Sequence, residues 1–136
     1  MHPMSQSLLK TFMWGISLAA LFLCAPVDPA FAEKTSVLIN APANAPPGSE
    51  ITIQVTATHD ANNFLHHTDW LKVMADGKEI ARWDYSWNKK PEGKVFTKEI
   101  KYTVTDSVEI TAEGHCNIHG SKGPQTITVS VPTTTN

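Results

Sequence analysis

The stretch ITIQVTAT, from Ile51 to Thr58, alternates apolar and polar side chains without interruption. Successive side chains of a β-strand point to opposite faces, so this alternation predicts a strand with one buried face. Working outward from it, the turn pair Asp76-Gly77 is a strong signal for a β-hairpin. Six further stretches are typical of strands: residues 37–40, 70–74, 79–85, 94–104, 108–111 and 126–131.

About seven short strands in roughly a hundred residues predict an all-β fold, an immunoglobulin-like antiparallel β-sandwich. No stretch after the first thirty residues shows an apolar period of 3.6 residues, which argues against helices. Trp83, Tyr85 and Trp87 alternate, and this predicts an aromatic face packed in the core or on a neighbouring sheet. A surface for partner docking or electron entry is the alternative interpretation of these three rings.

Length and charge narrow the class of protein further. The 136 residues suffice for one domain and not for two. The net charge is -2, with acids and bases interspersed. Because the chain has no basic stripe, it lacks the electrostatic footprint of a nucleic-acid-binding protein.

The first 32 residues have the pattern of a secretory signal peptide. Lys10 precedes an apolar run over residues 11–25, and Ala30-Phe31-Ala32 is a small-x-small cleavage signature. We therefore expect a cleaved leader, residues 1–32, and a periplasmic domain, residues 33–136, with no membrane segment of its own. A lipoprotein anchored at Cys24 and an uncleaved anchor helix are the alternatives.

Cleavage after Ala32 leaves one cysteine, Cys116. Exported proteins usually use cysteines in pairs, so a single one calls for a role: an inert buried thiol, half of an intermolecular bridge, or a metal ligand. All five histidines of residues 33–136 fall in two clusters, each directly after a predicted strand. Loops at one end of a sandwich can converge. The histidines are His59, His66 and His67 in one cluster, and His115 and His119 in the other.

The pair Cys116-x-x-His119 can chelate one metal ion if its loop turns, and Gly120 permits such a turn. Thiolate and imidazole together suit iron, copper or zinc, and disfavour calcium or magnesium. Structural zinc usually takes two or more cysteines, and blue copper usually adds an axial methionine. Met74, the one methionine after the leader, is far from the cysteine in sequence. Non-haem iron stays open, with copper as the alternative.

The string CNIHG, from Cys116 to Gly120, resembles the CN(I/L)HG motif of the superoxide reductases, which include neelaredoxins and the iron domain of desulfoferrodoxins. The string HHTDWL, from His66 to Leu71, is similar to the second motif of that family, and His59 matches the family's preceding histidine. The resemblance covers roughly residues 50 to 131.

The resemblance implies a mononuclear iron that alternates between Fe2+ and Fe3+ and reduces superoxide to hydrogen peroxide. Cys116 would be the axial ligand, and His59, His66 and His119 would be equatorial ligands, with Cys116 and His119 as the catalytic pair. The chain lacks the four-cysteine electron-transfer module of desulfoferrodoxins, so a separate periplasmic donor would supply electrons. A homo-oligomer is compatible with this family.

The chain departs from the family pattern in its ligands and its charge. The family has one more equatorial histidine in an N-terminal loop, but no histidine occurs between Glu33 and Thr58. His67, His115 or a water could replace it, or the site has three histidines and a cysteine. The residues just before His66 also lack the lysine that attracts superoxide in the family.

These departures keep two other functions open. One is a cupredoxin-like or iron-thiolate module that transfers electrons or binds metal without turnover. The other is a metal-binding accessory protein that serves another periplasmic enzyme.

Overall fold

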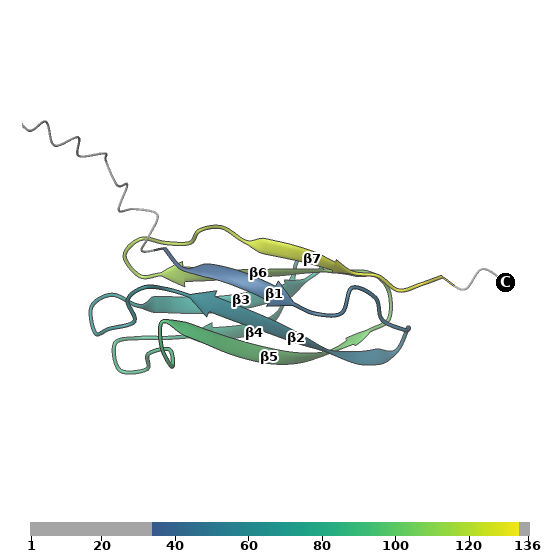
Figure 1. Cartoon of the computed structure of the whole chain (residues 1–136), viewed down its shortest axis with the longest axis horizontal. Coiled ribbons are helices and arrows are strands. Elements are labelled where there is room, and N and C mark those ends of the chain that lie inside the picture. The colour runs from purple at the N-terminus through teal and green to yellow at the C-terminus, as the bar shows by residue number, and fades with distance from the viewer. Residues whose placement is uncertain (1–33, 134–136) are drawn as a thin grey trace, which may run out of the picture.

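A computed structural model describes residues 34–133, so the expected leader, residues 1–32, and its Cys24 lie outside the described residues. The described chain forms strands joined by loops (Figure 1). The strands are β1 (Ser36–Asn40), β2 (Ser49–Thr58), β3 (Thr68–Ala75), β4 (Lys78–Asp84), β5 (Val95–Val104), β6 (Val108–Cys116) and β7 (Gln125–Val129).

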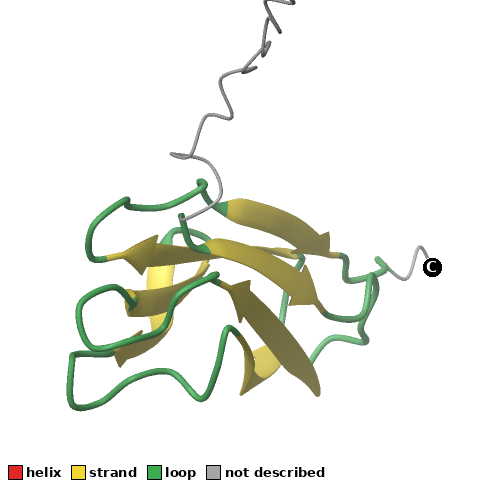
Figure 2. Cartoon of the chain, turned by 60° about the vertical axis from the view of Figure 1, so that its left-hand side comes forward, coloured by secondary structure: helices red, strands yellow, loops and turns green. Residues whose placement is uncertain are grey.

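The strands form two antiparallel sheets that face each other (Figures 1 and 2). One sheet has the order β1-β2-β5 and the other has the order β4-β3-β6-β7. The predicted class, an all-β antiparallel sandwich of seven strands, is therefore confirmed. In the described residues, no helix is long and apolar enough to span a membrane.

The core lies between the sheets and follows from the alternation in the sequence. In β2, Ile53 and Val55 are fully buried, while Gln54 between them faces outward and is partly exposed. Leu71 and Val73 of β3 are also fully buried. The hairpin at Asp76-Gly77 is confirmed, because Ala75 pairs with Lys78 across a two-residue turn. Both turn residues have positive φ, 46° and 77°, as a type I′ turn requires.

Strand β6 is longer than predicted and reaches Cys116 instead of ending near Thr111. Gly114 and the polar residues around it look like a strand end, yet the alternation of buried and exposed positions continues to Cys116. Gly114 is required there because a Cβ atom would lie 2.6 Å from Cγ2 of Thr35. The close approach of β1 to β6 hides this part of the strand from sequence reasoning.

The aromatic alternation also differs from the prediction at one of its three rings. Trp83 and Tyr85 pack against the core, and the Tyr85 ring meets Phe96 edge-on. Strand β4 ends at Asp84, so Trp87 lies beyond it in a loop and is 59% exposed. The predicted packed aromatic face is therefore wrong for Trp87.

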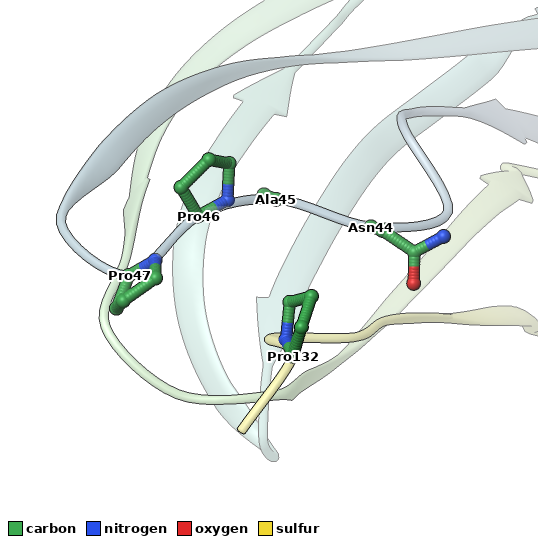
Figure 3. Close-up of a pocket in the computed structure, with 5 residues that line it drawn as sticks. All are labelled: Asn44, Ala45, Pro46, Pro47 and Pro132. Carbon is green, nitrogen blue, oxygen red and sulfur yellow. The ribbon is translucent and has the colours of Figure 1, made fainter. Parts of the chain in front are cut away.

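The two ends of the sandwich differ in their loops. One end, which we call the site end, carries the loops of residues 59–67, 85–94 and 117–124, which lie together in Figures 1 and 2. The other end has a cavity of about 290 Å³ with walls free of titratable side chains, so it offers no acid–base chemistry (Figure 3). Its lining residues are Asn44, Ala45, Pro46, Pro47 and Pro132.

The substitution Ile53→Ala tests the core. Ile53 is fully buried, so we expect a loss of about 2–5 kcal/mol in the free energy of unfolding. Leu38→Ala is the matched control, because Leu38 is 67% exposed and its truncation should change stability by less than about 0.5 kcal/mol. Urea unfolding measures both. Equal losses in the two variants would contradict the assigned core.

The hydroxyl of Tyr85 should make stability depend on alkaline pH. Burial, and then the negative charge of Glu92, raise the pKa of Tyr85 from 10.0 to about 12. A group with a raised folded pKa contributes stability that is complete below its unfolded pKa and is lost as the pH rises through the folded pKa. Tyr85→Phe should therefore remove one component of the stability loss between about pH 10 and about pH 12. Identical pH profiles of urea unfolding for the two proteins would contradict this.

Candidate metal centre

Two strand ends bring the histidine clusters together. His59 directly follows β2, and Cys116 is the last residue of β6. Thr68, the first residue of β3, pairs with Cys116 across the sheet. The loop of residues 59–67 therefore ends beside the loop that begins at Asn117, and the two loops share the site end.

Short distances centred on His66 and Cys116 link the ligand atoms of the four predicted residues into one group. His66 Nε2 is 3.0 Å from Cys116 Sγ and 3.0 Å from His119 Nδ1. His119 Nδ1 is 3.9 Å from the same sulfur. Ligand atoms of His59, His66 and Cys116 all lie within 4.8 Å of one another, a spacing that could hold a metal ion. The structure brings the four side chains together, and their role as ligands stays a prediction.

Asn62 organises the His59 side of the group, and sequence reasoning missed it. Its Oδ1 accepts a hydrogen bond from the backbone N–H of Thr68 at 2.8 Å and lies 3.2 Å from His59 Nδ1. Its Nδ2 donates to the carbonyl of Gly93 at 2.6 Å. Because an amide oxygen can only accept, this contact favours the tautomer of His59 that carries its proton on Nδ1. The signal in the sequence was the pair Asn62-Asn63, a common composition for turns.

Asn117 joins the two loops across the site. The side-chain Oδ1 of Asn117 accepts a hydrogen bond from the backbone N–H of His67, and the backbone N–H of Asn117 donates to the His67 carbonyl at 3.0 Å. Its Nδ2 donates to the carbonyl of Leu65 at 2.9 Å. Because these bonds flank His66 on both sides, Asn117 fixes the path of the loop that carries it.

The sulfur of Cys116 is buried and sits inside a tight turn. The N–H groups of Ile118 and His119 each donate to it at 3.4 Å. The turn closes through a hydrogen bond from Gly120 N to the Cys116 carbonyl, and Gly120 has a φ of 79°. Two backbone dipoles thus point at the sulfur and stabilise negative charge on it, as a thiolate ligand needs.

His115 lies outside the group, on the outer face of its sheet. Its Nδ1 is 2.8 Å from Asp69 Oδ1, and its ring stacks on Trp70 at 5.1 Å with an interplanar angle of 6°. Asp69 reaches it because a β-bulge between Thr68 and Trp70 turns Asp69 outward. Adjacent strand residues face opposite sides, so His115 points away while Cys116 points inward.

His67 is only 7% exposed, and it takes no part in the short distances that link the ligand atoms of the group. Its Nδ1 has no hydrogen-bond partner among the described residues. Residues 34–58 contain no histidine, so the described chain offers three imidazoles and one thiolate to a metal. This soft and borderline donor set fits iron, copper or zinc.

The site is closed on one side and open on the other. His59 and Cys116 are buried, with exposures of 1% and 0%, whereas His66 and His119 are half-buried. A small molecule from solvent would therefore approach over His66 and His119.

Comparisons with solved structures agree with the fold. Two structures of a superoxide reductase (neelaredoxin) from Ignicoccus hospitalis superpose with TM-scores of 0.61 and 0.59, each at 18% identity. They cover 77% and 76% of this chain, and it covers 86% and 87% of theirs. The sulfur carrier protein SoxY from Chlorobium limicola f thiosulfatophilum has a TM-score of 0.51 at 13% identity, with 71% and 79% covered.

At these identities the structural likeness establishes the fold alone. No curated protein matches the chain by sequence. The desulfoferrodoxin family model matches residues 29–122, which is more than half of the chain and includes all four residues of the group. The predicted resemblance is thereby confirmed, and the chain belongs to the desulfoferrodoxin family.

Proposed function

We propose that the protein is an exported mononuclear iron protein that reduces superoxide to hydrogen peroxide, with His59, His66, Cys116 and His119 as ligands. The observation that carries the proposal is the convergence of three imidazoles and one thiolate at one end of a desulfoferrodoxin-family sandwich. Iron bound there would supply the one electron that superoxide takes up, together with two protons, as it becomes hydrogen peroxide.

Some residues of the chain would hold the ligands in place, and others would leave a path for superoxide. Asn62 favours one tautomer of His59, and the N–H groups of Ile118 and His119 hold negative charge at the Cys116 sulfur. The buried side of the group excludes water from the thiolate. The half-buried imidazoles of His66 and His119 leave a path for a small anion.

Positive charge for attracting an anion comes from loops other than the one that carries His66. The loop of residues 59–67 offers only Asp60, but the two other loops of the site end contain four lysines. None of the four forms an ion pair in the described part of the chain. Their field attracts anions toward the open side. They are Lys89, Lys90, Lys94 and Lys122.

Lys94 is tied to the ligand group through its backbone. Its carbonyl accepts a hydrogen bond from the N–H of His59 at 2.8 Å, so this lysine begins beside a proposed ligand. The family has a lysine just before the histidine that corresponds to His66, and this chain does not. Lys94 would supply a positive charge near the group from a different loop.

Electron transfer at copper without turnover is the second candidate. Two histidines and one cysteine within 4.8 Å are the strong ligands of a blue-copper site. Within residues 34–133 the weak axial methionine of such a site is missing, because Met74 lies six residues along β3 from Thr68, about 20 Å away. This distance favours iron over the blue-copper arrangement.

The ligand set is tested with Cys116→Ser and a matched control, His115→Asn. Cobalt(II) bound to a thiolate gives an intense near-ultraviolet charge-transfer band, so titration with cobalt reports the sulfur directly. We expect the band in the wild type and in His115→Asn, since His115 is held by Asp69 away from the group. We expect its loss in Cys116→Ser. A band that survives in Cys116→Ser would remove Cys116 from the ligand set.

The function is tested on residues 33–136 purified from the periplasm. We expect about one iron per chain, a thiolate band after oxidation, and a shift of that band with azide, because the half-buried side leaves room for an anion. Pulse radiolysis should show reduction of superoxide at a rate that falls as salt screens the lysines. Copper in place of iron, or an iron spectrum that azide leaves unchanged, would move the protein to the electron-transfer class.

A further inference from the structure

Four large apolar side chains lie exposed around the candidate metal centre. We call them the site-end rim: Phe64, Leu65, Trp87 and Ile118, with exposures of 59%, 71%, 59% and 58%. The described residues expose six large apolar side chains in all, and the other two, Leu38 and Val95, lie on strands. Single exposed apolar residues are ordinary, so the gathering of four at one place is what needs explanation.

Contacts between the three loops make the rim continuous. The rings of Phe64 and Trp87 meet edge-on, with centroids 5.6 Å apart, and join the first loop to the second. The carbonyl of Leu65 accepts from Asn117 Nδ2, which places Leu65 beside the residue that precedes Ile118. The rim is therefore one surface built from segments far apart in the sequence.

The rim borders the open side of the ligand group. Leu65 directly precedes His66, and Ile118 directly precedes His119. These two histidines are the half-buried members of the group, so a protein that covers the rim comes within a few side-chain lengths of the site. Such proximity suits the transfer of an electron.

The loops that carry the rim also contain four lysines that form no ion pair in the described residues, together with Asp60 and with Glu92, which is paired with Lys98. Lys89 and Lys90 follow Trp87 in its loop, and Lys94 and Lys122 belong to the same end of the sandwich. The turns at the opposite end, residues 41–48, 76–77 and 105–107, carry Asp76 and Asp106, and one lysine, Lys78, directly follows the second of them. An apolar centre with a charged border is the usual anatomy of a protein–protein interface.

We propose that the site-end rim is the docking surface for a one-electron donor protein whose redox centre lies near an apolar patch bordered by aspartates and glutamates. The proposal rests on the proposed function, because it names the partner that would reduce the iron. One electron passes from the reduced centre of the donor to ferric iron, and neither an atom nor a proton is transferred.

Charge favours such a donor over a second copy of the chain. Two copies that met through their rims in a two-fold dimer would bring the same lysines of both chains into one interface. Like charges across an interface oppose binding, whereas an acidic border complements the lysines and speeds association.

Cytochrome b5, a small acidic haem protein, serves as the probe, and the basic haem protein cytochrome c is its counterpart. Stopped-flow absorbance follows oxidation of the ferrous cytochromes by the ferric protein. Binding is measured separately, by NMR of the zinc-substituted protein, so that docking is observed without any redox activity. We expect cytochrome b5 to shift signals of the three site-end loops and to react more slowly as salt rises.

Two variants and two matched controls test the surface. Trp87→Ser and Lys90→Glu should each lower the second-order rate constant with cytochrome b5 by on the order of tenfold at low salt. Leu38→Ser is the control for Trp87→Ser, because Leu38 is similarly exposed but lies on a strand. Lys78→Glu is the control for Lys90→Glu, because Lys78 lies at the opposite end of the sandwich. Both controls should leave the rate constant unchanged. Circular dichroism checks that each variant folds.

Three outcomes would overturn the proposal: unchanged rates in both rim variants, equal binding of cytochrome c, or a dimer in sedimentation that Trp87→Ser dissociates. Reduction of superoxide with a small-molecule reductant is measured in parallel. If that reaction persists while docking fails, the surface is wrong and the proposed function stands. If docking succeeds while that reaction fails, the docking surface is right and the proposed function is wrong.

Discussion

The pairing of β3 with β6 is the constraint on which the ligand group depends, because it places Thr68 opposite Cys116. Thr68 is fully buried and its hydroxyl lies 3.1 Å from the hydroxyl of Thr35, which ties the start of β3 to the residue before β1 of the other sheet. A slip of one residue in this register would turn Cys116 toward solvent and His115 toward the core. The pairing therefore decides that Cys116, and not the neighbouring His115, lies beside the other histidines of the group.

Hydrogen bonds from two asparagines convert that register into a site. Asn62 binds its own loop to β3 and to the loop of Gly93, and Asn117 binds the two ligand-bearing loops to each other. Buried loop backbone must find hydrogen-bond partners, and here it finds them in side chains instead of a strand. The imidazoles are thus positioned by the scaffold before any metal enters, which reduces the ordering that binding would otherwise require.

Sequence reasoning was most successful where one physical signal dominated. The alternation in β2 and the Asp76-Gly77 turn each allow a single interpretation, and both are confirmed. It was wrong where tertiary contacts decided the outcome. The end of β6 depends on the fit of Gly114 against Thr35, and the exposure of Trp87 depends on where β4 stops. Neither feature produces a periodic pattern of apolar and polar residues in the sequence.

The histidines show the same division. His115 and Cys116 are neighbours in sequence, and only the bulge at Asp69 and the stack on Trp70 show how His115 is held on the outer face. The convergence of His59 and His66 with Cys116 followed from loops sharing one end of a sandwich. The role of Asn62 could not be predicted, since an asparagine in a loop is typical of any turn.

The net charge of -2 conceals how the charges are distributed. Lysines without ion pairs in the described residues lie in the loops of the site end, while the turns of the other end are acidic. A molecule with this asymmetry presents its positive end to anions, and superoxide and an acidic donor protein are both anionic. The same lysines would then serve both encounters, with superoxide small enough to reach the half-buried imidazoles and the donor held outside by the rim. Because a docked donor covers the open side, reduction of the site and entry of superoxide would have to alternate in time.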